Sequence, residues 1–111
     1  YIKMWASWCP ICLAGLAEID DLSAEKDRAF EVITIVSPSH KGEKSTADFI
    51  EWYNGLEYKN IKVLLDENGE MIDRTHLRGY PFNLFLDGDL NVKKTVPGHL
   101  NLEQIRAFAE R

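Results

Sequence analysis

Two cysteines, Cys9 and Cys12, stand three residues apart and are the only cysteines in a chain of 111 residues. A structural disulfide framework needs several cysteines that close long loops, and a loop as short as this one would add little stability. The pair is therefore better suited to thiol–disulfide chemistry than to a structural role. In such chemistry one thiolate attacks a substrate disulfide, and the second thiol resolves the mixed disulfide that forms.

The cysteines fall where a predicted strand gives way to a predicted helix. The apolar run Tyr1–Trp5 indicates a buried strand, Ala6-Ser7-Trp8 a turn, and Pro10 suits the first turn of a helix, where its missing N–H is not needed. Unpaired backbone N–H groups and the positive end of the helix dipole stabilise a thiolate at such a position. We therefore expect Cys9 to attack and Cys12, one turn further along, to be the more buried, resolving cysteine.

Three other interpretations of the pair stay open. A C-x-x-C pair supplies two zinc ligands, but the three histidines, His40, His76 and His99, are spaced singly and no second paired motif is present. The cysteines could instead be buried as small hydrophobic side chains, or the chain could be a noncatalytic module that keeps the fold. No metal and no separate cofactor are expected, because a redox-active disulfide between Cys9 and Cys12 would carry the electrons.

Strand and helix patterns alternate along the rest of the chain. This alternation predicts a parallel sheet covered on both faces, and Asp87-Gly88-Asp89 predicts a hairpin that adds an antiparallel edge. We therefore expect one α/β domain over residues 1–111, with a central mixed β-sheet flanked by helices. The expected strands are Tyr1–Trp5, Phe30–Val36, Ile61–Leu65, Phe82–Leu86 and Asn91–Val96, and the expected helices start near Cys9, run from Ser45 to Gly55, and span Glu70–Leu77 and Leu102–Glu110.

The composition argues against several classes of function. The formal net charge is −5 and no basic run stands out, so a nucleic-acid partner is not expected. No apolar run approaches the roughly 20 residues that a membrane span needs. The first residues also lack the charged and apolar regions of a signal peptide. Because the chain begins inside a predicted strand, we expect it to be N-terminally truncated, with further sequence before Tyr1.

The segment around the cysteines resembles a known family. Trp5-Ala6-Ser7-Trp8-Cys9-Pro10-Ile11-Cys12 is similar to the W-A-x-W-C-x-x-C signature of thioredoxin-like proteins. The resemblance extends over the whole chain and points to the TlpA/ResA-type branch of thiol–disulfide oxidoreductases. It implies a thioredoxin-like fold with a helical insertion at Ser37–Asn60, and it implies that the family's first strand and helix are missing. The segments that carry it downstream are Leu65-Asp66, Asn68-Gly69 and Tyr80-Pro81, followed by Phe82–Leu86 and Asp87-Gly88.

A narrower resemblance concerns the partner. Ile35-Val36-Ser37-Pro38, Trp52-Tyr53-Asn54-Gly55-Leu56 and Tyr58 are similar to thioredoxin-like domains that serve, or are fused to, extracytoplasmic methionine sulfoxide reductases. This implies a bacterial periplasmic or cell-surface location, a dithiol that reduces a disulfide in the sulfoxide reductase, and recharging by a membrane thiol carrier. Two alternatives stay open: a TlpA/ResA-like reductase for cytochrome c maturation, and a noncatalytic partner-binding module.

The family resemblance also implies roles for residues near the cysteines. Pro81 corresponds to a proline that follows a cis peptide bond and faces the cysteine pair, and the backbone of Tyr80 would pair with an extended substrate segment. Gly98 corresponds to a glycine whose missing side chain leaves room beside the cysteines, or else it is a simple loop glycine. The other residues expected to contact substrate are Trp8, Pro10 and Ile11.

Four positions depart from the family pattern. The position of a buried acid, six residues before the first cysteine, holds Lys3, whose ammonium would favour a thiolate if buried but which we expect to reach the surface. Ala17 replaces a proline that usually kinks the helix, so a straighter helix is expected. Gly15 replaces an acid three residues after the second cysteine. Phe82 replaces a small hydroxyl residue after Pro81 and is expected to change the surface of the substrate groove.

Overall fold

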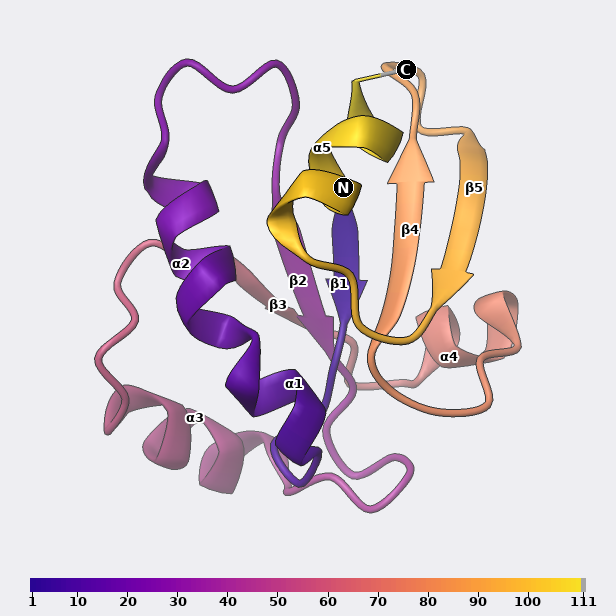
Figure 1. Cartoon of the computed structure of the whole chain (residues 1–111). Coiled ribbons are helices and arrows are strands. Elements are labelled where there is room, and N and C mark those ends of the chain that lie inside the picture. The colour runs from indigo at the N-terminus through magenta and orange to yellow at the C-terminus, as the bar shows by residue number, and fades with distance from the viewer. Residues whose placement is uncertain (111) are drawn as a thin grey trace.

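Strands and helices alternate in the computed structural model, which describes residues 1–110 (Figure 1). None of the described helices is long and apolar enough to cross a membrane. In chain order the elements are β1 (Ile2–Met4), α1 (Pro10–Ala14), α2 (Leu16–Ala24), β2 (Ile33–Val36), α3 (Thr46–Asn54), β3 (Val63–Leu65), α4 (Glu70–Thr75), β4 (Phe82–Leu86), β5 (Val92–Pro97) and α5 (Leu102–Ala109).

The five strands form one mixed sheet in the order β3-β2-β1-β4-β5. Strands β1, β2 and β3 are parallel, whereas β4 runs antiparallel to β1 and β5 runs antiparallel to β4. The predicted mixed sheet and its closing hairpin are therefore confirmed. The alternation of strands and helices also predicted that β4 would continue the parallel part of the sheet, and this is wrong, because β4 pairs antiparallel with β1. Strand β1 is the middle strand, so the loop that carries Cys9 leaves the sheet from its centre.

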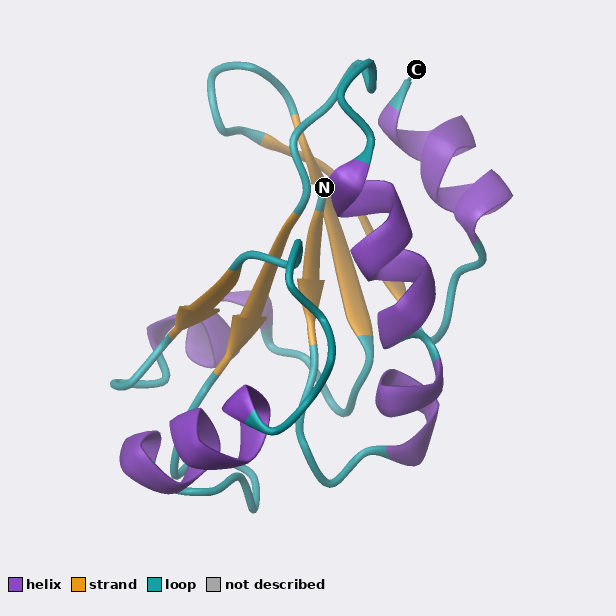
Figure 2. Cartoon of the chain, turned by 90° about the vertical axis from the view of Figure 1, so that its left-hand side faces the viewer, coloured by secondary structure: helices purple, strands orange, loops and turns teal. Residues whose placement is uncertain are grey.

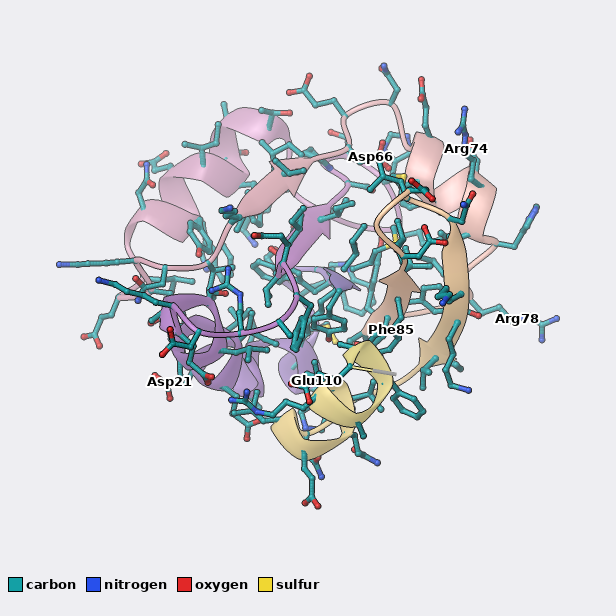
Figure 3. All side chains as sticks on the ribbon, turned by 90° about the horizontal axis from the view of Figure 1, so that it is seen from above. Asp21, Asp66, Arg74, Arg78, Phe85 and Glu110 are labelled. Carbon is teal, nitrogen blue, oxygen red and sulfur yellow. The ribbon has the colours of Figure 1, made fainter. Side chains whose placement is uncertain are left out.

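The two faces of the sheet are covered differently. Successive side chains of a strand point to opposite faces, so Tyr1 and Met4 face opposite ways. Tyr1 packs with residues of α2 and α5, two helices that lie on one side of the sheet in Figure 2, and Figure 3 shows Phe85 of β4 next to α5. Met4 packs with Ile72 of α4 on the other face. Helix α3 joins the α2 side, where Phe49 packs against the buried indole of Trp5.

Short polar side chains cap the starts of helices α3 and α5, as expected. Ser45 accepts a hydrogen bond from the Asp48 N–H at the start of α3, and Asn101 forms a reciprocal capping box with Gln104 at the start of α5. Asp66, which lies beside α4 in Figure 3, accepts hydrogen bonds from two N–H groups of the first turn of α4 and from the Ser37 hydroxyl. This carboxylate links the loop after β2 to the loop after β3.

The helix expected to run straight past Cys12 is instead broken at Gly15. The Gly15 N–H donates to the carbonyls of Cys12 and Leu13, and a new helix, α2, begins at Leu16. The expectation that Ala17 would leave a straight helix is therefore wrong. Glycine is a poor helix former. The space left by the missing side chain of Gly15 is occupied by the Lys3 ammonium and the His99 ring.

A buried amide holds the β4–β5 hairpin against β1. The Asn83 side-chain amide nitrogen donates to the carbonyls of Val96 and Gly98 at 2.8 Å and 2.7 Å. Its carbonyl oxygen accepts the Tyr1 hydroxyl proton at 2.5 Å. Asn83 is almost completely buried. If its side chain were removed, water could not reach these partners to form the lost hydrogen bonds. The loop that follows β5 is thereby fixed beside the start of β4.

Replacing Asn83 with alanine is expected to lower the free energy of unfolding by about 3 kcal/mol, because two carbonyls and a hydroxyl lose buried partners. Urea denaturation followed by circular dichroism measures the change. Asn54→Ala is the matched control, because Asn54 is exposed at the end of α3, and it should change the free energy by less than about 0.5 kcal/mol. Equal effects of the two substitutions would contradict the role of the Asn83 amide.

Candidate active site

Cys9 occupies the position immediately before the first turn of α1. Its backbone is extended, and its sulfur accepts a hydrogen bond from the Cys12 N–H at 3.3 Å. A side chain in this place satisfies one of the N–H groups that have no partner inside the helix, and it lies at the positive end of the helix dipole. Pro10 follows as the first helical residue. The predicted placement of the sulfur at a strand-to-helix junction is confirmed.

The two cysteines differ in exposure, and burial changes the pKa of Cys12. Cys9 is 5% exposed, whereas Cys12 is completely buried. The Cys12 thiol points at Cys9, with the two sulfur atoms 2.6 Å apart. Burial, followed by the hydrogen bond to Cys9, raises the pKa of Cys12 to about 12, although Lys3 acts in the opposite direction. Cys12 therefore holds its proton at neutral pH, which fits the predicted resolving role.

The Tyr80–Pro81 peptide bond is cis, as predicted. It lies opposite the cysteines, and the Cys9 thiol is directed at the Tyr80 carbonyl oxygen at 3.7 Å. The Tyr80 ring meets the edge of the Trp8 ring, with centroids 6.0 Å apart. The loop before β4 and the loop after β1 therefore meet at the sulfur of Cys9, although 71 residues separate Cys9 from Tyr80.

The residues expected to contact substrate form an apolar surface around Cys9. Trp8 is 49% exposed and Ile11 is 58% exposed, both unusually open for large apolar side chains, and Pro10 between them is also exposed. Exposed apolar residues that adjoin one another mark surfaces for other proteins. The structure thus brings these three residues to the mouth of the cysteine pair.

Gly98 lies beside Pro81 and donates its N–H to the Pro81 carbonyl at 2.9 Å. Its φ is +93°, a conformation that favours glycine. A Cβ atom added at Gly98 would meet nothing within 4 Å. The expectation that its missing side chain leaves room beside the cysteines is therefore not what the structure shows, and the loop-glycine alternative explains the residue through its backbone conformation.

Two sequence expectations about nearby side chains are wrong. Lys3 does not reach the surface: it is 3% exposed, and its ammonium lies near Gly15, between the sheet and the helices. Phe82 does not line the substrate groove, because it pairs with Met4 in the sheet register and packs with it on the face covered by α4. Successive side chains of a strand point to opposite faces of the sheet. This alternation sets the face on which Lys3 and Phe82 lie, whatever the polarity of Lys3 or the place of Phe82 after Pro81.

Sequence reasoning missed one residue near the site, Glu43. Its buried carboxylate accepts hydrogen bonds from the Ser7 N–H at 2.7 Å, from the Ser7 hydroxyl and from the Lys44 N–H. The Lys44 ammonium donates to the Ser7 hydroxyl at 2.9 Å. These contacts fasten the polar loop after β2 to the turn that precedes Cys9. A glutamate in a polar loop gives no local sign of such burial.

The histidines do not assemble a metal site with the cysteines. Within residues 1–110, no group of three or more His, Cys, Asp or Glu side chains is arranged to hold a metal ion. Nδ1 of His40 lies 2.8 Å from the Pro38 carbonyl oxygen, His76 ends α4, and the ring of His99 lies near Gly15. The described residues therefore give the zinc interpretation no support.

The raised pKa of Cys12 predicts selective alkylation. At neutral pH iodoacetamide is expected to modify Cys9 at least about 100-fold faster than Cys12, because a thiol whose pKa is raised remains protonated until the pH approaches that value. Peptide mass spectrometry after timed quenching measures both rates. In guanidinium the two rates should become similar. Equal rates in the folded protein would contradict the assigned asymmetry.

Several known proteins are similar to this chain in sequence. No model of a protein family matches the chain. The chain is 84% identical to an uncharacterized protein of Haemophilus influenzae, and it covers 71% of that protein. It is 25% identical to sporulation thiol-disulfide oxidoreductase A of Bacillus subtilis and 28% identical to thiol-disulfide oxidoreductase ResA of Oceanobacillus iheyensis. These alignments cover 98% and 96% of the chain but only 65% and 53% of the two relatives.

Two solved structures are more similar in sequence than these oxidoreductases. The exposed lipoprotein thioredoxin Etrx1 of Streptococcus pneumoniae superposes with a TM-score of 0.94 at 43% identity, over 98% of this chain and 81% of Etrx1. The N-terminal domain of PilB from Neisseria gonorrhoeae superposes with a TM-score of 0.92 at 32% identity, over 98% of this chain and 73% of that structure. The chain belongs to the thioredoxin-like thiol–disulfide oxidoreductases of the TlpA/ResA type.

Proposed function

We propose that Cys9 and Cys12 reduce a disulfide in a partner protein, and that this partner is a methionine sulfoxide reductase. The observation that carries the redox activity is the position of the Cys9 sulfur. It lies at the start of α1, 3.7 Å from the Tyr80 carbonyl, and Cys12 is buried directly behind it. An attacking sulfur beneath a rim of exposed apolar side chains and a protonated sulfur behind it suit the two steps of disulfide reduction.

In the first step the Cys9 thiolate attacks one sulfur of the partner disulfide. A Cys9–partner bond forms, the partner S–S bond breaks, and the other partner sulfur leaves as a thiolate that takes up a proton. In the second step Cys12 loses its proton and attacks the Cys9 sulfur, so that the Cys9–Cys12 disulfide forms and the second partner sulfur is released. Two electrons pass to the partner, and a membrane thiol carrier returns two electrons to the domain.

The surface around Cys9 suits an extended protein segment. The backbone of Tyr80 lies beside the Cys9 sulfur, where it can pair with such a segment as an added strand. The exposed Trp8 and Ile11 side chains offer apolar contact on either side of the sulfur. Together with Pro10, these are the residues that we propose bind substrate.

The choice of partner rests on chemistry and on the narrower sequence resemblance. Repair of a methionine sulfoxide oxidises the cysteines of the repairing enzyme, so a dithiol donor is needed after each turnover. The resembling segment contributes Trp52 and Tyr53, which pack around Trp5 behind the cysteines. Etrx1 is an exposed lipoprotein, and this supports an extracytoplasmic location for this chain as well.

A second candidate is reduction of apocytochrome cysteines during cytochrome c maturation. The relatives named ResA and DsbE favour a TlpA/ResA-like role, at 28% and 27% identity. The same two cysteines would act in that reaction, and only the disulfide that enters the groove would differ.

The reduced domain is to be mixed, in separate reactions, with an oxidised methionine sulfoxide reductase and with an oxidised C-x-x-C-H peptide. Thiol formation on each partner is then followed by quenching and mass spectrometry. We expect the sulfoxide reductase to be reduced at least about tenfold faster, a difference of about 1.4 kcal/mol in activation free energy. A faster reaction with the peptide would favour the cytochrome role.

Two serine variants test the assignment of the cysteines in the same assay. Cys12→Ser should stop at a mixed disulfide between Cys9 and the partner, because no resolving thiol remains. Cys9→Ser should form no such adduct and should reduce neither partner. Partner turnover that survives Cys9→Ser would exclude the redox mechanism and leave the noncatalytic binding module.

A further inference from the structure

Lys3 is a buried cation that forms no salt bridge with any residue from 1 to 110. It lies in the middle of β1, between Thr34 of β2 and Asn83 of β4 in the sheet register, and is 3% exposed. The side chains of these two neighbours are engaged elsewhere, since Thr34 bonds to the Lys62 carbonyl and Asn83 bonds to the carbonyls of β5 and its loop. Within residues 1–110 no carboxylate forms a salt bridge with Lys3.

A buried ammonium is unfavourable unless another group compensates its charge. The ammonium of Lys3 is directed at the junction between α1 and α2. A Cβ atom added at Gly15 would lie 3.0 Å from Lys3 Nζ and 3.4 Å from the ring of His99. Gly15 itself donates its N–H to the Cys12 carbonyl. Because Gly15 has no side chain, the Lys3 ammonium can occupy the space next to it, about one helical turn after Cys12.

The charged and titratable groups around Lys3 come from three segments. Cys9 and Cys12 belong to the start of α1, Glu18 to α2, and His99 to the loop after β5. Burial lowers the pKa of Lys3, and the sulfurs of Cys12 and Cys9, followed by Glu18, raise it. The cysteine sulfurs are thus the main groups whose negative charge Lys3 can compensate.

We propose that Lys3 is the electrostatic partner of Cys12, and that its buried ammonium stabilises the thiolate that Cys12 forms when it resolves the mixed disulfide on Cys9. In that step Cys12 gives its proton to water and attacks the Cys9 sulfur. The bond from Cys9 to the substrate sulfur breaks, and the substrate leaves as a thiolate. Lys3 keeps its proton throughout, so it acts through Cys12 and not on the substrate. The inference rests on the proposed disulfide-reducing function.

A chromogenic disulfide separates the two steps. One equivalent of dithiobis-nitrobenzoate releases one thionitrobenzoate when Cys9 is modified in mild acid, and a jump to neutral pH releases the second when Cys12 attacks Cys9. Replacing Lys3 with methionine keeps length and removes charge. We expect Lys3→Met to slow the second release about tenfold, which corresponds to one unit in the pKa of Cys12, and to leave the first release within about twofold of the unmodified protein.

Lys62→Met is the matched control. Its ammonium is largely exposed and lies near Glu31, so the same charge is lost away from the cysteines, and both releases should keep their rates. A folded Lys3→Met protein whose second release stays within about twofold of the unmodified protein would overturn the proposal. If Lys3→Met does not fold, Lys3→Gln decides the question. It also removes the charge but keeps a polar side chain at this buried position, so a slower second release supports the proposal and an unchanged one overturns it.

The pH profile separates charge from packing. Burial holds the pKa of Lys3 below its usual value, so its charge is present at low pH and is lost as the pH rises through that pKa. The second-release rates of Lys3→Met and of the unmodified protein should therefore converge at high pH, whereas a packing defect would slow the variant by a constant factor. Failure of Cys9 to release the first thionitrobenzoate would instead count against the proposed function itself.

Discussion

The hydrogen bond from the Cys12 N–H to the Cys9 sulfur is the interaction on which the site depends. It requires an extended backbone at Cys9 and a helix that begins at the next residue, and both follow from Pro10 at the first helical position. Because β1 is the middle strand of the sheet, the sulfur is carried to the centre of the sheet edge. The Tyr80 carbonyl, from the loop before β4, lies 3.7 Å from the same sulfur.

The two cysteines lie in different environments. Around Cys9 the structure places exposed apolar side chains, whereas Cys12 is enclosed by Trp5, Leu16 and other core residues. The low polarity of that enclosure keeps a proton on Cys12. A resolving cysteine must nevertheless ionise during the reaction, and a buried ammonium at Lys3 offers compensation without opening the site to water. Burial and charge therefore act in opposite directions on one thiol.

The sequence predicted the parts of the site that depend on neighbouring residues. The cysteine pair at a helix start, the capping side chains Ser45 and Asn101 and the β4–β5 hairpin have local signals, and the resemblance supplied the cis bond. The unpredicted features depend on distant contacts. The Glu43 carboxylate is buried because Ser7, 36 residues away, donates to it, and Lys3 stays inside because Gly15 on another element leaves space for its ammonium.

The reduction potential of the Cys9–Cys12 pair tests the central claim most directly. The domain would be equilibrated with defined ratios of oxidised and reduced thiol, and its redox state would be determined by thiol alkylation. A donor of electrons to a partner disulfide should have a midpoint near the thioredoxin end of the scale, at roughly −230 mV or lower. A midpoint of about −120 mV would make the pair a donor of disulfides and would contradict the proposed reductase.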